Sequence, residues 1–107
     1  MGGFDRGDFV ILWEFEVAAH AADAFRRAYG PDGAWVALFR RAPGFVETRL
    51  LEDRARPGRF VTLDRWQDEG AWRAFRERFA AEYEALDAAG EGWTGVERRI
   101  GEFEERR

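Results

Sequence analysis

A hydroxyl, a carboxylate and an indole N–H occur at every second position of one short segment, as Thr62, Asp64 and Trp66. In an extended strand these side chains point to the same face, with about 6 to 7 Å between successive members. A carboxylate buried on such a face has its pKa raised toward the range of a general base, and a hydroxyl beside it can donate a hydrogen bond. The spacing therefore predicts a proton-transfer site around Asp64. The alternative is that Asp64 forms a salt bridge to Arg49 or to another arginine.

The residue types that are missing limit the chemistry further. The 107 residues contain no Cys, Ser, Lys or Asn, and His20 is the only histidine. Catalysis through a serine, a thiolate or a lysine Schiff base is excluded, which leaves Thr48, Thr62 and Thr94 as weak nucleophiles. One imidazole cannot build a zinc site of the usual Cys/His kind, and we expect no metal or cofactor. The 5 Trp, 10 Phe and 2 Tyr instead predict an aromatic-walled pocket whose substrate carries out much of the reaction itself.

Charge and hydropathy bear on partners and location. The net charge is −4, the 17 basic residues are all arginine, and they form no basic block. This pattern argues against nucleic acid or an anionic membrane as a partner. The longest apolar run, Phe9–Trp13, is too short to span a bilayer, and Met1–Asp8 has none of the features of a signal peptide. We therefore expect a cytoplasmic protein whose ligand is a small aromatic molecule.

Hydrophobic periodicity predicts six elements in the order strand, helix, strand, strand, helix, strand. The expected strands are Phe9–Val17, Phe45–Glu52, Arg59–Trp66 and Thr94–Phe103, and the expected helices are Ala18–Arg41, kinked at Gly30–Gly33, and one that Asp68 caps. This order predicts an α+β, ferredoxin-like βαββαβ domain with a four-stranded antiparallel sheet and both helices on one face. A single domain is expected over residues 9–103, with a flexible lead-in at 1–8 and a charged tail at 104–107.

The sheet face opposite the helices would be left open in such a domain. Large apolar residues occupy both alternating sets of the first strand, with Val10 and Leu12 on one side and Ile11 and Trp13 on the other. Monomeric proteins avoid exposing large contiguous apolar patches of the kind that these side chains would form. A second copy across a two-fold axis is the simplest cover, so the sequence predicts a homodimer.

Several stretches resemble the antibiotic biosynthesis monooxygenase family of dimeric α+β barrels, namely VILWEFEV, RAPGFVETRLLED, RFVTLDRWQDEGAWRAF and AEYEALD. The resemblance covers residues 9–103 and includes the landmarks Pro43-Gly44-Phe45 and Asp64-Arg65-Trp66. It implies that two ferredoxin-like subunits join into a barrel, each with a cavity between its sheet and its helices. Anthrone-oxidising members of that family use dioxygen without metal, haem or flavin, because the phenolic substrate reduces oxygen itself. The resemblance thus implies a cofactor-independent monooxygenase acting on a small phenolic, quinol or polyketide-like compound.

The resemblance also implies roles for individual residues. Trp66 matches a family tryptophan at the end of the third strand, whereas Thr62 stands where polyketide-oxidising members carry Asn. Trp72 lies roughly where those members carry Tyr, and its indole can donate a hydrogen bond but cannot accept a proton. The candidate catalytic residues are Asp64, Thr62 and Trp66, and Trp72 and Trp13 are the candidate substrate-binding walls. Core packing is the alternative for each tryptophan.

Other functions on the same fold remain open at this point. A non-catalytic dimer that binds small molecules or serves as an accessory protein fits the missing Asn and Tyr. A cyclase or isomerase that uses a carboxylate base fits as well. The haem-degrading branch of the family does not fit, because it needs an Asn on the first strand, where this chain has Trp13, and a His on the second helix.

Overall fold

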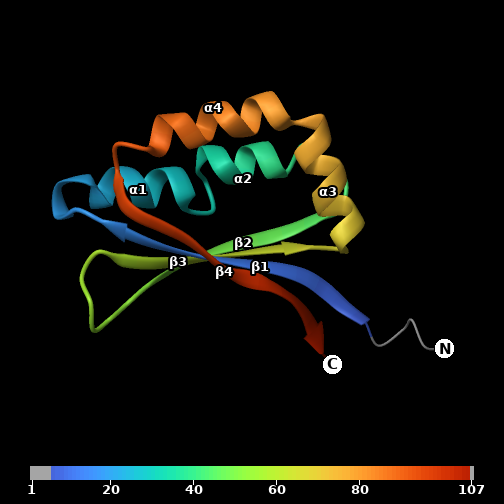
Figure 1. Cartoon of the computed structure of the whole chain (residues 1–107), viewed down its shortest axis with the longest axis horizontal. Helices are drawn as coiled ribbons and strands as arrows, with labels where there is room; N and C mark the ends of the chain where they lie inside the picture. The colour runs from blue at the N-terminus through green and yellow to red at the C-terminus, as the bar shows by residue number, and fades with distance from the viewer. Residues whose placement is uncertain (1–5, 107) are drawn as a thin grey trace.

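The computed structural model of the chain describes residues 6–106 and has the predicted α+β architecture (Figure 1). Its elements are β1 (Arg6–Val17), the 3-10 helix η2 (Ala19–Ala21), α1 (Ala22–Tyr29), α2 (Ala34–Phe39), β2 (Phe45–Glu52), β3 (Arg59–Trp66), α3 (Glu69–Arg78), α4 (Ala80–Gly90) and β4 (Thr94–Arg106). The strands form one antiparallel sheet in the order β2-β3-β1-β4. This is the ferredoxin-like βαββαβ arrangement, so the predicted fold class is confirmed. Each helical connection is divided into two α-helices.

The central strands β1 and β3 present one face to the helices. Their aromatic and β-branched residues suit a pleated, half-buried surface. Ile11 and Phe15 of β1 are buried on the helix side, together with Phe60 and Trp66 of β3. Burial alternates along the whole of β3, so every second side chain of this strand faces the helices.

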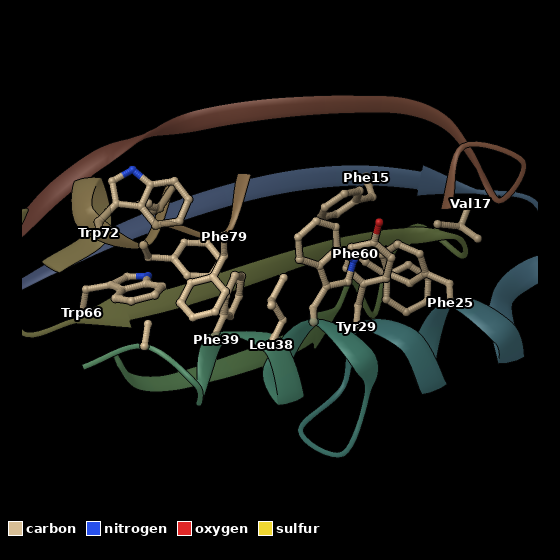
Figure 2. Packing of buried hydrophobic residues seen from close by; sticks show 14 of the residues in the cluster. Phe15, Val17, Phe25, Tyr29, Leu38, Phe39, Phe60, Trp66, Trp72 and Phe79 are labelled. Atoms are coloured by element: carbon tan, nitrogen blue, oxygen red, sulfur yellow. The ribbon is translucent and has the colours of Figure 1, made fainter. Parts of the chain in front are cut away.

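The helices all cover the same face of the sheet and enclose an aromatic core between the two layers (Figure 1). The labelled rings of Figure 2 form one group at each end of the core: Trp66, Trp72, Phe39 and Phe79 at one end, and Phe15, Phe25, Tyr29 and Phe60 at the other. Leu38 lies between the two groups. Neighbouring rings are in direct contact in both groups: the Phe25 and Tyr29 centroids are 4.2 Å apart, and those of Phe39 and Trp66 are 5.5 Å apart.

The helix boundaries partly follow the sequence prediction. Asp68 caps α3 as expected, because its carboxylate accepts a 2.8 Å hydrogen bond from the backbone N–H of Ala71. The second helical connection is not one continuous helix, however. It breaks at Phe79, whose φ of −111° and ψ of 28° separate α3 from α4. The apolar spacing runs through Phe79 without a Gly or Pro, so nothing in the local sequence marks this break.

The outer strands are longer than predicted. β1 begins at Arg6, and β4 continues to Arg106, which pairs with Arg6. Residues 6–8 and 104–106 are therefore strand, which corrects the expected flexible lead-in at 6–8 and the expected separate tail, although residues 104–106 are exposed. The rest of the expected lead-in, residues 1–5, and residue 107 lie outside the described residues.

The sheet face that points away from the helices combines apolar and paired charged side chains. Leu51, Val96 and Phe103 are exposed there, each to about half. Glu14 lies at the centre of the same face and accepts hydrogen bonds from two arginines, of which Arg59 contributes most to holding the pKa of that carboxylate below its ordinary value. Across residues 6–106, no helix has the length and apolar character needed to cross a bilayer.

Candidate active site

A narrow cavity lies between the helix-facing side of the sheet and the helices. Every strand and each of α1 to α4 contributes to its lining, and its polar members are Thr48, Thr62, Asp64, Asp87 and Glu97. Its volume is about 30 Å³, which is enough for one or two water molecules but not for an aromatic ring. Any organic ligand must therefore displace part of the wall.

Thr62 and Asp64 both line this cavity, as the alternation of β3 predicted. They are buried, with exposed fractions of only 4% and 6%. In the β1–β3 ladder Thr62 lies opposite Trp13, which also lines the cavity. A hydroxyl, a carboxylate and an indole from neighbouring strands thus meet on one surface of the site.

Thr48 is a further polar residue of the site, which the sequence analysis named only as a weak nucleophile and did not place beside Asp64. It lies opposite Asp64 in the β2–β3 ladder, and its hydroxyl donates a 2.8 Å hydrogen bond to Asp64 Oδ1. The signal that could have found it is the register of the hairpin. Asp53 and Arg59 close the connector through a backbone hydrogen bond, and counting back equally along both strands pairs Thr48 with Asp64.

The environment of Asp64 favours its protonated form. Burial raises the pKa of this carboxyl from 3.8 to about 6, and the hydrogen bond from Thr48 has a smaller effect in the opposite direction. The predicted alternative, a salt bridge to Arg49, is wrong. Arg49 points to the other face of β2 and pairs with Glu47 at 3.3 Å. Within residues 6–106 no arginine lies within salt-bridge distance of Asp64.

The three candidate tryptophans have different positions. Trp13 is half-buried and Trp72 is buried, and both line the cavity. Trp66 has no exposed surface and is not part of the lining, which corrects the expectation that it shares the pocket with Thr62 and Asp64. It sits at the end of β3, where Phe39, Phe45, Trp72 and Phe75 enclose it with ring centroids 5.1 to 5.5 Å away. Its indole N–H has no hydrogen-bond partner.

The helices supply the rest of the aromatic wall, including two phenols that the sequence analysis did not name as site residues. Tyr29 comes from α1 and Tyr83 from α4, and Tyr83 meets Trp35 of α2 edge to face with centroids 4.9 Å apart. Burial raises the pKa of each tyrosine to about 12. Both phenols are therefore protonated at neutral pH and can donate hydrogen bonds into the cavity.

Two carboxylates lie where the cavity opens to solvent. Asp87 on α4 and Glu97 on β4 line it, and both residues are exposed. The pKa of Glu97 is raised, first by its partial burial and then by the nearby charges of Asp87 and Glu91. No arginine or histidine occurs in the lining formed by the described residues, so the cavity is acidic from its interior to its mouth.

Other features of the structure offer less chemistry. Two wider hollows of about 320 and 290 Å³ lie at the surface, but Asp68 in the first caps α3 and Glu16 in the second pairs with Arg56. His20 is exposed in η2 and does not reach the cavity. Between residues 6 and 106, no three His, Cys, Asp or Glu side chains gather closely enough to hold a metal ion.

Comparison with known proteins agrees with this architecture. The sequence profile of antibiotic biosynthesis monooxygenases matches residues 8–86, which include most of the cavity lining. The chain belongs to the antibiotic biosynthesis monooxygenase family. No curated protein sequence matches the chain significantly.

Solved structures of other proteins share the antibiotic biosynthesis monooxygenase fold with this chain. A variant of SnoaB, a cofactor-independent oxygenase from Streptomyces nogalater, is 26% identical, with 94% of each chain covered and a TM-score of 0.64. A protein from Deinococcus radiodurans, classed in the same family, is 16% identical over 92% of this chain and 93% of its own, with a TM-score of 0.72. A protein from Nitrosomonas europaea is 18% identical over 97% of this chain and 93% of its own, with a TM-score of 0.68. The last two show the likeness of fold alone.

Proposed function

We propose that this member of the antibiotic biosynthesis monooxygenase family is a cofactor-independent monooxygenase that oxidises a small phenolic, quinol or polyketide-like compound with dioxygen. The observation that carries the proposal is Asp64, a buried carboxylate in an aromatic-walled cavity with no cationic side chain in its described lining. A pKa of about 6 suits a general base at neutral pH. The likeness to SnoaB, at 26% identity, supports the same class of reaction.

The reaction can be written with the groups of this site. Asp64 accepts a proton from an acidic C–H of the substrate, and the resulting carbanion transfers one electron to dioxygen. The substrate radical and superoxide combine to form a C–O bond, and Asp64 returns its proton to the peroxide. Loss of the second C–H proton and cleavage of the O–O bond then give a carbonyl and water. One oxygen atom enters the product, and all four electrons come from the substrate.

The other lining residues would bind and orient the substrate. Thr62 can donate a hydrogen bond to an oxygen atom of the substrate or of the peroxide, and Trp13 and Trp72 provide aromatic walls. The protonated phenol of Tyr83 offers a further hydrogen-bond donor in the cavity. Trp66 acts indirectly in this proposal, because it supports Trp72 from the core at a centroid distance of 5.5 Å.

Substrate binding requires the cavity to open, and α4 is the wall best suited to move. Gly90 is the only fully buried residue of this helix, and the partly buried Tyr83 and Leu86 anchor it to the core, so few side chains have to be released for the helix to move. A movement of α4 would separate Tyr83 from Trp35 and widen the cavity. The same closure would exclude water once the substrate is bound.

Oxygen consumption tests the proposed function directly. The purified protein is supplied with a panel of hydroquinones and anthrones in metal-chelated buffer, with Glu84→Gln as a control that removes one charge on α4 outside the cavity. We expect oxygen uptake and a carbonyl product for at least one compound, in the wild type and the control alike. No uptake across the panel would count against a monooxygenase.

A non-catalytic small-molecule binder is the second candidate. It is favoured by the small volume of the cavity and by Trp72, whose indole cannot accept a proton. In this case ligands would raise the melting temperature without any product being formed, because binding to the folded state alone stabilises it.

We further propose that the protein forms a homodimer through the uncovered face of its sheet. This proposal is supported by the exposed apolar side chains Leu51, Val96 and Phe103 on that face. The central charge on the same face, Glu14, is already paired with arginines of its own chain and so does not oppose burial by a second copy.

A further inference from the structure

The charged side chains in the described lining of the cavity are all acidic. Asp64 lies deep between the sheet and the helices, and Asp87 and Glu97 lie at the mouth. The described lining contains no arginine and no histidine, although the chain has 17 arginines. A ligand that enters this cavity therefore meets negative charge at both ends and no countercharge in the wall.

Two arginines that lie beside lining residues of the cavity are engaged elsewhere. Arg76 places its guanidinium over the rings of Tyr83 and Trp72, at 4.1 Å and 5.5 Å from their centroids. Arg99 lies beside Trp13 in the β1–β4 ladder and pairs with Glu102 at 2.8 Å. Neither side chain belongs to the lining, so neither offers a direct partner to an anionic group inside.

Asp64 has an oxygen atom free for a ligand. The hydrogen bond from Thr48 engages Oδ1, and no group among the described residues donates to Oδ2. A buried carboxylate oxygen with an unused acceptor site favours a ligand that brings a donor or a positive charge.

The aromatic wall also suits a cation. The faces of Trp and Tyr rings attract ammonium and guanidinium groups through their quadrupoles, and cages of such rings recognise organic cations. Arg76 already makes this contact with Tyr83 and Trp72 from outside the cavity. Trp13, Trp35 and Tyr29 offer further rings within it.

The carboxylates of the cavity also affect the pKa values of its two buried phenols. The pKa values of Tyr29 and Tyr83 are raised mainly by burial, and the charges of Asp87 and Glu97 add to the effect at both residues. Asp64 contributes as well at Tyr83, whereas Arg76 acts in the opposite direction. A phenolic ligand that lies among the same groups would resist ionisation unless it carried a positive charge of its own.

We propose that the cavity selects an aromatic compound that bears a protonated amine and rejects one that bears a carboxylate. The ring would lie among the aromatic side chains near Asp64, and the ammonium group would lie between Asp87 and Glu97 at the mouth. As a statement about the substrate of the oxidation, this inference rests on the proposed function. Selectivity for charge can nevertheless be measured by binding alone.

Three compounds of similar shape test the proposal by isothermal titration calorimetry: tyramine, which is a cation, 4-ethylphenol, which is neutral, and 4-hydroxyphenylacetate, which is an anion. At low ionic strength tyramine should bind at least about tenfold more tightly than 4-hydroxyphenylacetate, with 4-ethylphenol between them. The ratio should fall as salt is added, because the mouth is open to solvent.

Two double variants locate the effect. Asp87→Asn with Glu97→Gln removes both charges at the mouth, and Glu77→Gln with Glu84→Gln removes two exposed helical charges outside the lining. The preference for tyramine should fall to roughly threefold or less in the first variant and stay at the wild-type value in the second. Equal or tighter binding of the anion, an unchanged ratio in the first variant, or no binding of tyramine to the wild type would each overturn the proposal.

Oxygen uptake with the same compounds separates this inference from the proposed function. Selective binding of tyramine without oxygen consumption by any amine-bearing phenol or quinol would support the charge selectivity and contradict the monooxygenase. Oxygen consumption that is as fast with anionic quinols as with amine-bearing ones would support the monooxygenase and contradict the charge selectivity.

Discussion

Thr48 on β2 donates a 2.8 Å hydrogen bond to Asp64 on β3, directly across the ladder that joins the two strands. This hydrogen bond holds Oδ1 of Asp64 in place and leaves Oδ2 available to a ligand in the cavity. Because both residues lie on paired strands of the sheet, a movement of the helices would leave the position of the carboxylate largely unchanged. This arrangement is what a proton acceptor needs to stay in place while the helical wall opens and closes.

Replacement of Asp64 by Asn should lower turnover at least tenfold and leave the fold intact. The amide has the same shape but cannot accept a proton, and a general base typically contributes about 10² or more to the rate. Oxygen uptake per folded molecule, with circular dichroism as the check on folding, measures the effect. If the variant unfolds while turnover per folded molecule is unchanged, Asp64 is a structural residue and the monooxygenase loses its base.

Replacement of Thr48 by Val should shift the pH dependence of turnover upward. The hydrogen bond lowers the pKa of Asp64, so its loss raises the pH at which the carboxylate ionises. The midpoint of kcat/KM against pH reports this change, and Thr48→Ser should restore the wild-type midpoint. A Val variant that folds poorly but keeps the same midpoint would show that Thr48 only supports the packing.

The sequence predicted those parts of the site that depend only on the alternation of side chains within a single strand. The pleat of β3 places Thr62 and Asp64 on one face whatever surrounds them, and both line the cavity. Thr48 could not be placed without the register of β2 against β3. Trp66 shares the alternation but not the cavity, because its position depends on which rings cover the end of the strand. The break at Phe79 and the contribution of Tyr83 depend on packing between layers in the same way.

The free energy of unfolding should depend on pH through Asp64. Burial raises the pKa of this carboxyl from 3.8 to about 6, so between these values the folded protein holds a proton that the unfolded chain has released. The stability that protonated Asp64 contributes is full below the lower value and is lost as the pH rises to the upper one, by about 3 kcal/mol in all. The Asp64→Asn variant has no carboxyl to ionise at this position, so its free energy of unfolding should not fall in this way. The difference in stability between the variant and the wild type should therefore shift in favour of the variant as the pH rises from 3.8 to about 6. Parallel unfolding curves for the two proteins at every pH would contradict the raised pKa.

Trp66 should matter for stability more than for turnover. Trp66→Ala should cost about 3 to 5 kcal/mol because it empties the most enclosed part of the core. Trp66→Phe should cost only about 1 kcal/mol, since the smaller ring also removes an indole N–H that has no partner. Its turnover per folded molecule should stay within roughly twofold of the wild type, whereas Trp72→Phe in the cavity wall should raise KM. A loss of turnover in Trp66→Phe as large as in Asp64→Asn would make Trp66 a catalytic residue.

The protein should be a homodimer at micromolar concentration, with the outer face of the sheet buried between the two copies. Leu51 and Phe103 on that face are too exposed for a monomer to tolerate easily, and they share the face with the buried, paired charge of Glu14. Phe103→Glu should shift the mass measured by light scattering toward the monomer, because it adds an unpaired charge to an apolar interface. Ala85→Glu, on the exposed side of α4, makes the same kind of change on the helical layer and should leave the dimer unchanged. A monomeric wild type would contradict the prediction, as would a crystal without a two-fold contact above about 1,000 Å².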